Sequence, residues 1–157
     1  MADETLLLLA KDVRNKTLKL LEGVDDQQAR FAAPHLTNTV LWHAGHAIMV
    51  NEHLGVSPAT GTPPAYPAGW FEKFGWKSSP AAVTDWPGVQ QVREQLQMQL
   101  QRLTAAIESL SPQQLSRVVE GGRTLRHSIL HGLHDEAGHQ GEMYLLKKMY
   151  AKREGSG

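Results

Sequence analysis

Residues 89–110 carry apolar side chains at intervals of three and four residues, with polar residues between them. This spacing matches the 3.6-residue turn of an α-helix, so it places the apolar side chains on one face of a long helix. Such a helix is stable when that face packs against other elements, and the neighbours are most simply further helices. The apolar positions are Val89, Val92, Leu96, Leu100, Leu103, Ile107 and Leu110.

The segments near the two ends of the chain have the same periodicity and recognisable helix ends. The first follows Asp3, a residue type that caps helix N-termini, and stops at Gly23. The last follows Thr124, another capping residue type, and continues to about Lys152. Both segments are therefore predicted to be long helices.

Two central segments complete the prediction. Residues 40–54 follow Thr37 and Asn38, which can cap a helix, and Gly55 supplies a stop. The helix with the long apolar stripe begins at Pro87, a residue well suited to a first helical position. No segment shows the convincing apolar alternation of a β-strand. The sequence therefore predicts an all-α fold, a four-helix bundle.

Length and composition limit the class of protein. The 157 residues are 41% hydrophobic with a formal net charge of +0, which suits one domain over residues 1–153 followed by a flexible tail at 154–157. Balanced charge favours neither nucleic acid nor an anionic membrane as a partner, and no apolar run approaches the roughly 20 residues of a membrane span. We expect a cytoplasmic protein. Because the chain has no cysteine, any metal ion must be bound by His, Asp or Glu.

A long connection, residues 56–86, separates the second and third predicted helices and holds most of the prolines. It is far longer than an ordinary link between helices, so it is predicted to be a crossover loop. Four aromatic residues, Trp70, Phe71, Phe74 and Trp76, fall within it. They are expected to anchor the loop to the bundle, and some of them alternatively line a ligand pocket.

Histidines are concentrated in the second and last predicted helices. Asp135 and His139 are four residues apart, so they present an oxygen and a nitrogen on the same side of the last helix. A histidine from a neighbouring helix would complete a three-residue site for Zn, Ni, Fe or Mn. His43 and His46 lie on the second helix, three residues apart and facing similar directions. The alternative is that these histidines only hydrogen-bond to neighbouring helices.

Glycines flank these histidines on both helices. Gly45, Gly132, Gly138 and Gly141 each cost roughly 1 kcal/mol relative to alanine inside a helix unless something compensates. They indicate either close contact between the helices or room for a ligand beside an ion.

The segments "NTVLWHAGHAIMVNEHL" (38–54) and "LRHSILHGLHDEAGHQGEMYLLKKM" (125–149) resemble the DinB-like (DinB/YfiT-like) superfamily of metal-dependent proteins. Helix count and order match over nearly the whole chain. The resemblance implies an up-down-down-up four-helix bundle with a divalent ion held by three side chains. Matched to the family motifs, the ligands are His43 in "WHAGH", His139 in "HQGE" and Asp135 four residues earlier.

Asp135 stands where the family commonly has histidine, or glutamate in some branches. Aspartate is one methylene shorter than glutamate, so His134, Glu136 or a water molecule is an alternative to complete the metal shell.

The resemblance also implies an activity. Similar proteins include thiol-dependent isomerases and S-transferases that use bacillithiol or mycothiol, and a chain without cysteine must take its sulfur from such a small molecule. A metal-dependent hydrolase is the rival, with Glu136 or Glu142 as general base. His46 is a further catalytic candidate, able to donate to a substrate or to bound water. A non-catalytic, metal-stabilised binding protein is the third possibility, and the family often forms homodimers.

Overall fold

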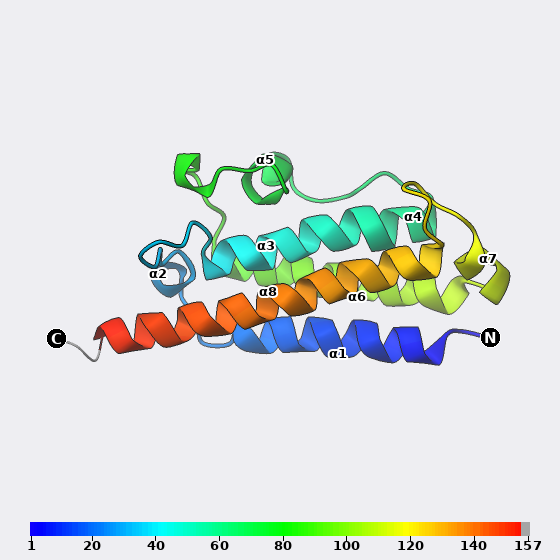
Figure 1. Cartoon of the computed structure of the whole chain (residues 1–157), viewed down its shortest axis with the longest axis horizontal. Coiled ribbons are helices and arrows are strands. Elements are labelled where there is room, and N and C mark those ends of the chain that lie inside the picture. Colours follow the sequence, from blue (N-terminus) through cyan, green and yellow to red (C-terminus); the bar gives the residue numbers. More distant parts are fainter. Residues whose placement is uncertain (155–157) are drawn as a thin grey trace.

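The computed structural model describes residues 1–154, and residues 155–157 lie outside the described part of the chain. Every regular element among the described residues is a helix, which confirms the all-α prediction. Of the tail predicted at 154–157, only Glu154 is described, and it ends the last helix. The longest helices form the body of the molecule (Figure 1): α1 (Glu4–Leu20), α3 (Val40–Asn51), α6 (Val89–Ser109) and α8 (Leu125–Glu154).

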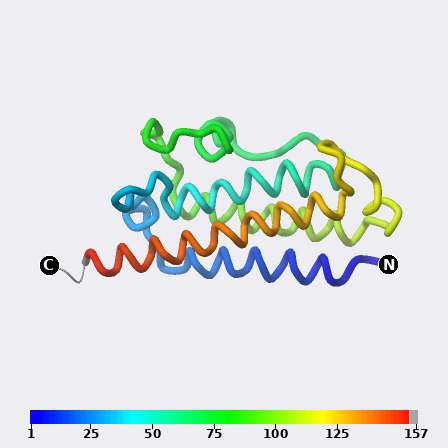
Figure 2. The backbone as a smooth tube through the Cα atoms, in the orientation of Figure 1, coloured from blue at the N-terminus to red at the C-terminus, as the bar shows by residue number. Residues whose placement is uncertain are grey.

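The long helices lie side by side along the long axis of the molecule. α8 contacts both α1 and α3, and these two helices each also contact α6. α3 and α6 run in one direction, whereas α1 and α8 run in the other (Figure 1). The tube in Figure 2 traces the long connection that carries the chain from the end of α3 back to the start of α6. The most extensive contact joins α3 to α8, the two helices that hold most of the histidines.

Side-chain caps define the starts of three long helices. Asp3 accepts a hydrogen bond of 3.0 Å from a backbone N–H three residues further on, as predicted for α1. Thr124 does the same at 3.2 Å for α8. The cap of α3 is Thr39, next to the predicted Asn38, with a bond of 3.2 Å. After α1 the chain turns at Gly23, whose φ of +69° lies in the left-handed region that favours glycine.

Gly55 does not end the second long helix, contrary to the prediction. The helical path continues through a π-helical turn, η1 (Glu52–Val56), and then α4 (Ser57–Thr60). It stops at Gly61, where φ is +72°. Gly55 instead faces α6, because a Cβ added there would lie 3.3 Å from Cδ1 of Leu103. Its small side chain therefore serves close helix contact.

α6 begins at Val89, two residues after the predicted start at Pro87. Oδ1 of Asp26 accepts a hydrogen bond of 2.7 Å from the backbone N–H of Val89, so a side chain distant in sequence caps the helix. This cap was not visible in the local sequence pattern. The short helices of the connections are α2 (Asp26–Ala29), α5 (Trp70–Phe74), the 3₁₀ helix η2 (Pro80–Ala82) and α7 (Pro112–Ser116).

The crossover segment, residues 61–88, packs on α3 through α5 (Figure 1). Trp70 and Phe74 are buried, so they anchor the segment as expected. The ring of Phe74 lies directly over Gly45, where an added Cβ would approach it to 2.3 Å and could not be accommodated. Trp76, in contrast, is 53% exposed.

Buried apolar side chains from all four long helices form the core. Among the helices described for residues 1–154, none combines the length and apolar character needed to cross a bilayer.

Candidate metal centre

The contact between α3 and α8 brings three polar side chains together. His46 of α3 and the pair Asp135 and His139 of α8 each offer one ligand atom, and these atoms all lie within 4.8 Å of one another. Oδ2 of Asp135 is 3.9 Å from Nε2 of His46 and 3.3 Å from Nε2 of His139. The structure therefore contains a His/Asp group of the kind that holds divalent metal ions.

The ring of His46 is held in one orientation. Its Nδ1 lies 2.6 Å from the backbone carbonyl oxygen of Phe74 in the crossover segment. A carbonyl oxygen only accepts, so Nδ1 carries the proton and Nε2 presents a lone pair towards Asp135. The ring of Trp42 stacks on the imidazole with 4.5 Å between centroids. Burial lowers the pKa of His46, although the bond to Phe74 opposes it, so the imidazole is neutral, as a metal ligand must be.

Asp135 supplies the negative charge of the group. Its contact with His139 lowers the pKa of the carboxyl, whereas burial acts in the opposite direction, and the net effect is a lowered pKa. Asp135 is therefore ionised at neutral pH. Its Oδ2 is buried, and Nε2 of His139, 3.3 Å away, is not placed to donate a hydrogen bond of good geometry to it. Burial opposes the ionised form of this carboxylate, and a cation at the group would offset that cost.

His43 lies beside this group and not within it. Its Nδ1 is 2.8 Å from Nδ1 of His139, and its Nε2 is 3.1 Å from Oε2 of Glu142. Both ring nitrogens thus have a neighbouring partner in this structure. Burial is the main cause that lowers the pKa of His43 to about 3, so this ring is also neutral. The geometry therefore groups His46 with Asp135 and His139, and the expected ligand role of His43 stays a prediction.

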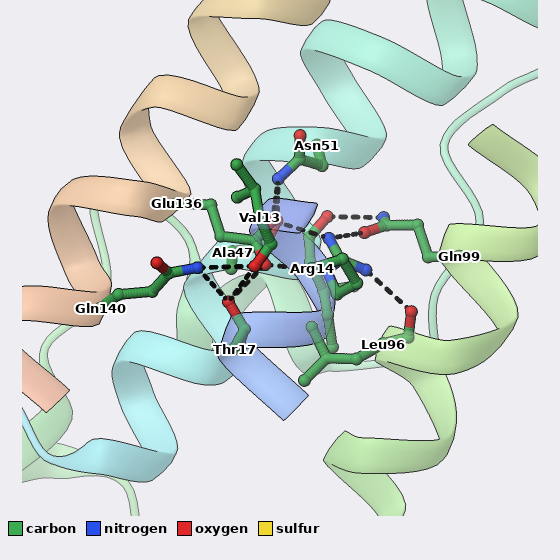
Figure 3. Close-up of polar contacts among 10 residues, drawn as sticks. Val13, Arg14, Thr17, Ala47, Asn51, Leu96, Gln99, Glu136 and Gln140 are labelled. Carbon is green, nitrogen blue, oxygen red and sulfur yellow. Dashed lines mark hydrogen bonds and ion pairs between the residues drawn. The ribbon is translucent and has the colours of Figure 1, made fainter. Parts of the chain in front are cut away.

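Glu136 is buried and points into the core between the long helices (Figure 3). Its Oε1 accepts hydrogen bonds from Nε of Arg14 at 2.8 Å and from the hydroxyl of Thr17 at 2.6 Å. Its Oε2 accepts from Arg14 at 3.0 Å and from Nδ2 of Asn51 at 2.9 Å. In this structure the carboxylate of Glu136 is engaged by these donors and does not contact the His/Asp group.

The other polar side chains of this region point in different directions. Arg14, the partner of Glu136, also donates to the carbonyl of Leu96 and to Gln99, so this buried charge pair joins α1 to α6 and α8. His134 is exposed on another side of α8 and does not reach the ligand group. Asp135, four residues before His139, is therefore the carboxylate of the His/Asp group, although its side chain is shorter than that of glutamate.

The flanking glycines have two different explanations. A Cβ at Gly45 would clash with Phe74, and one at Gly132 would lie 2.8 Å from Oδ1 of Asn51, so both allow close packing around α3. Gly138 and Gly141 face open space, with nothing within 4 Å of an added Cβ. Packing explains the first two glycines, and no contact within the chain explains the other two.

A pocket of about 370 Å³ adjoins this region. His43 and Glu142 form part of its wall, together with polar residues that precede α3 and apolar residues of α8. Its size is within the range of small-molecule sites, roughly 300–1,000 Å³. The other lining residues are His35, Leu36, Thr37, Asn38, Leu145 and Leu146.

An all-helical fold with a His/Asp group between its second and last long helices defines a class of helical proteins with a candidate metal site. The model of the DinB superfamily matches residues 9–143, so the chain belongs to this superfamily. Among solved structures, the fold is similar to the crystal structure of a conserved protein from Enterococcus faecalis, with a TM-score of 0.73 and 16% identity. That match covers 94% of this chain and 96% of the other. No curated protein matches the sequence.

Proposed function

We propose that the protein binds one divalent metal ion through Nε2 of His46, Oδ2 of Asp135 and Nε2 of His139. The observation that carries this proposal is the buried Oδ2 of Asp135, which accepts no hydrogen bond of good geometry although two imidazole nitrogens lie within 3.9 Å of it. The hydrogen bond from Nδ1 of His46 to a carbonyl is the arrangement that ordinarily orients a metal-bound histidine.

Two features favour a reactive centre over a closed structural one. Three protein ligands leave at least one position of a divalent ion for another molecule, as in catalytic zinc sites. The side chains of Asp135 and His139 are 34% and 17% exposed, so a small molecule can approach them from solvent.

We further propose that the molecule that uses this position is a low-molecular-weight thiol, and that the protein is a thiol-dependent S-transferase or isomerase of the bacillithiol or mycothiol type. A divalent ion bound there would supply the positive charge that stabilises a thiolate relative to its thiol. The chain has no cysteine, so the sulfur must come from outside. The neutral rings of His43 and His46 are buried on the protein side of the centre.

The positions of the carboxylates bear on the rival proposal of a hydrolase, which needs a general base near bound water. Glu136 is fully engaged by Arg14, Thr17 and Asn51. Glu142 contacts His43 on the side opposite His139. Neither carboxylate expected for this role contacts the His/Asp group in this structure, so neither is positioned there as the general base of a hydrolase.

The experiment is a titration of cobalt-loaded protein with bacillithiol, mycothiol and simpler thiols. Sulfur ligation should add a charge-transfer absorption, and it should persist well below the free thiol pKa of about 8.5, with release of a proton. Silence with every thiol, alongside exchangeable bound water, would overturn the thiol proposal in favour of hydrolysis. Silence without exchangeable water would indicate a structural ion that only holds α3 against α8.

A further inference from the structure

His43 and Glu142 lie outside the three proposed ligands, yet they form a chain of polar contacts that ends on one of them. Nε2 of His43 is 3.1 Å from Oε2 of Glu142, and Nδ1 of His43 is 2.8 Å from Nδ1 of His139. His43 is 1% exposed and Glu142 is 62% exposed. A buried imidazole therefore connects a surface carboxylate to a histidine of the ligand group.

The positions of the protons in this series of contacts follow from its exposed end, Glu142. An ionised carboxylate only accepts hydrogen bonds, so Nε2 of His43 carries a proton and donates to Glu142. In a neutral ring, Nδ1 of His43 then has a lone pair and accepts from Nδ1–H of His139. His139 consequently presents the lone pair of its Nε2 towards Asp135, which is the form that binds a metal ion.

The competing tautomer of His139 would disable the centre. With its proton on Nε2, His139 could donate to Oδ2 of Asp135, only 3.3 Å away. That single proton would occupy two of the three ligand atoms. Acceptance by Nδ1 of His43 disfavours this state, because it requires the proton of His139 to be on Nδ1.

We propose that His43 and Glu142 are positioning residues, which hold His139 in its Nδ1–H tautomer and so keep Nε2 of His139 and Oδ2 of Asp135 available to a metal ion. This inference rests on the proposed metal-binding function. It assigns a role to His43, the buried histidine that is not among the three proposed ligands, and to Glu142 beside it.

The first test measures metal affinity by competition with a chelator. His43→Leu should weaken binding by roughly 10- to 100-fold, the usual cost of losing a partner behind a metal ligand. His43→Asn places an amide oxygen near the position of Nδ1 and should restore part of the affinity. Glu142→Ala, on the surface, should weaken binding by about twofold to fivefold, as for an exposed polar pair. His134→Ala, on another side of α8, is the matched control and should bind as the wild type does.

The second test reads the tautomer directly. In metal-free protein labelled with ¹⁵N-histidine, His139 should be protonated at Nδ1 in the wild type and in His43→Asn. In His43→Leu a population protonated at Nε2 should appear. A purely structural role for His43 would lower stability without moving this proton.

The outcomes separate the inference from the function on which it rests. Failure of the wild type to bind any divalent ion would overturn the proposed function. If the wild type binds and His46→Ala does not, then unchanged affinity and an unchanged His139 tautomer in His43→Leu would overturn the positioning roles alone. If His43→Leu does not fold, the variants Glu142→Ala and His43→Asn test the positioning roles instead. Wild-type metal affinity in Glu142→Ala, together with full loss of affinity in His43→Asn, would contradict the proposed series of contacts from Glu142 through His43 to His139.

Discussion

Oδ2 of Asp135 lies 3.3 Å from Nε2 of His139, one helical turn further along α8, and accepts no hydrogen bond of good geometry although it is buried. His46 approaches the same oxygen from α3 with a nitrogen whose orientation is set by the crossover segment. When both imidazoles present lone pairs, as metal ligation requires, their nitrogens and the ionised oxygen repel one another, and a cation between them would remove this repulsion. The charge of Asp135 is therefore central to the proposed centre.

Replacing Asp135 by asparagine should test that charge. Asp135→Asn keeps the size of the side chain and removes its negative charge, so metal affinity should fall by more than roughly 100-fold, beyond the usual loss for an outer partner. The metal-free variant should be slightly less stable than the wild type at neutral pH, because the lowered pKa of Asp135 means that its ionised carboxylate is stabilised in the folded protein. Chelator competition and thermal unfolding measure the two effects. Equal metal affinity in the variant and the wild type would remove Asp135 from the ligand set.

Glu136 should matter for stability and not for metal binding. Glu136→Leu leaves the guanidinium of Arg14 buried without its carboxylate, so it should lower the free energy of unfolding by about 3–5 kcal/mol. In the double variant Arg14→Met/Glu136→Leu no charge is stranded, and the loss should be smaller than for Glu136→Leu alone. Urea unfolding of the metal-free proteins tests this. If Glu136→Leu were stable but no longer bound the metal ion, Glu136 would have to be counted among the metal-binding residues.

Two glycines near the centre form a matched pair for substitution. Gly45→Ala should displace Phe74, whose ring leaves no space for a Cβ, and thereby disturb the carbonyl that orients His46. We expect lower stability and weaker metal binding. Gly138→Ala meets nothing within 4 Å and should stabilise α8 by up to about 1 kcal/mol. Metal binding as tight as that of the wild type in both alanine variants would show that close packing at Gly45 does not position His46.

The stability of the metal-free protein should depend on pH through His43. Its pKa is about 3 in the folded protein and 6.5 ordinarily, so the unfolded chain binds the extra proton between these values. Stability contributed by the neutral ring is thus present above pH 6.5 and is lost as the pH falls towards 3. Each fully linked proton corresponds to about 1.4 kcal/mol per pH unit. The free energy of unfolding of chelator-treated protein, measured against pH over this range, should have a shallower slope in His43→Asn than in the wild type. Identical slopes would contradict the lowered pKa of His43.

Much of the fold was predictable because it depends on local patterns. The caps Asp3 and Thr124 and the apolar stripe of α6 are properties of neighbouring residues, and all appear where expected. The start of α6 differed because Asp26, distant in sequence, caps it. Gly55 was misread as a stop because only the contact with Leu103 reveals its role.

The candidate site was predictable to a lesser degree. Spacing along α8 alone identified Asp135 and His139 as a pair. The choice between His43 and His46 was different, because every residue of α3 is buried and no polar face indicates which ring points to α8. The grouping of His46 with Asp135 and His139 involves the carbonyl of Phe74, which comes from the crossover segment and has no signature in the sequence.

The metal content of protein purified without a nickel column tests the central claim most directly. We predict about one divalent ion per chain in the wild type, the same content in His134→Ala, and loss of the ion in His46→Ala/His139→Ala, with all three proteins folded by circular dichroism. The absence of a bound ion in the wild type after incubation with Zn, Ni, Fe or Mn, or an unchanged ion content in the double variant, would contradict a metal centre at His46, Asp135 and His139.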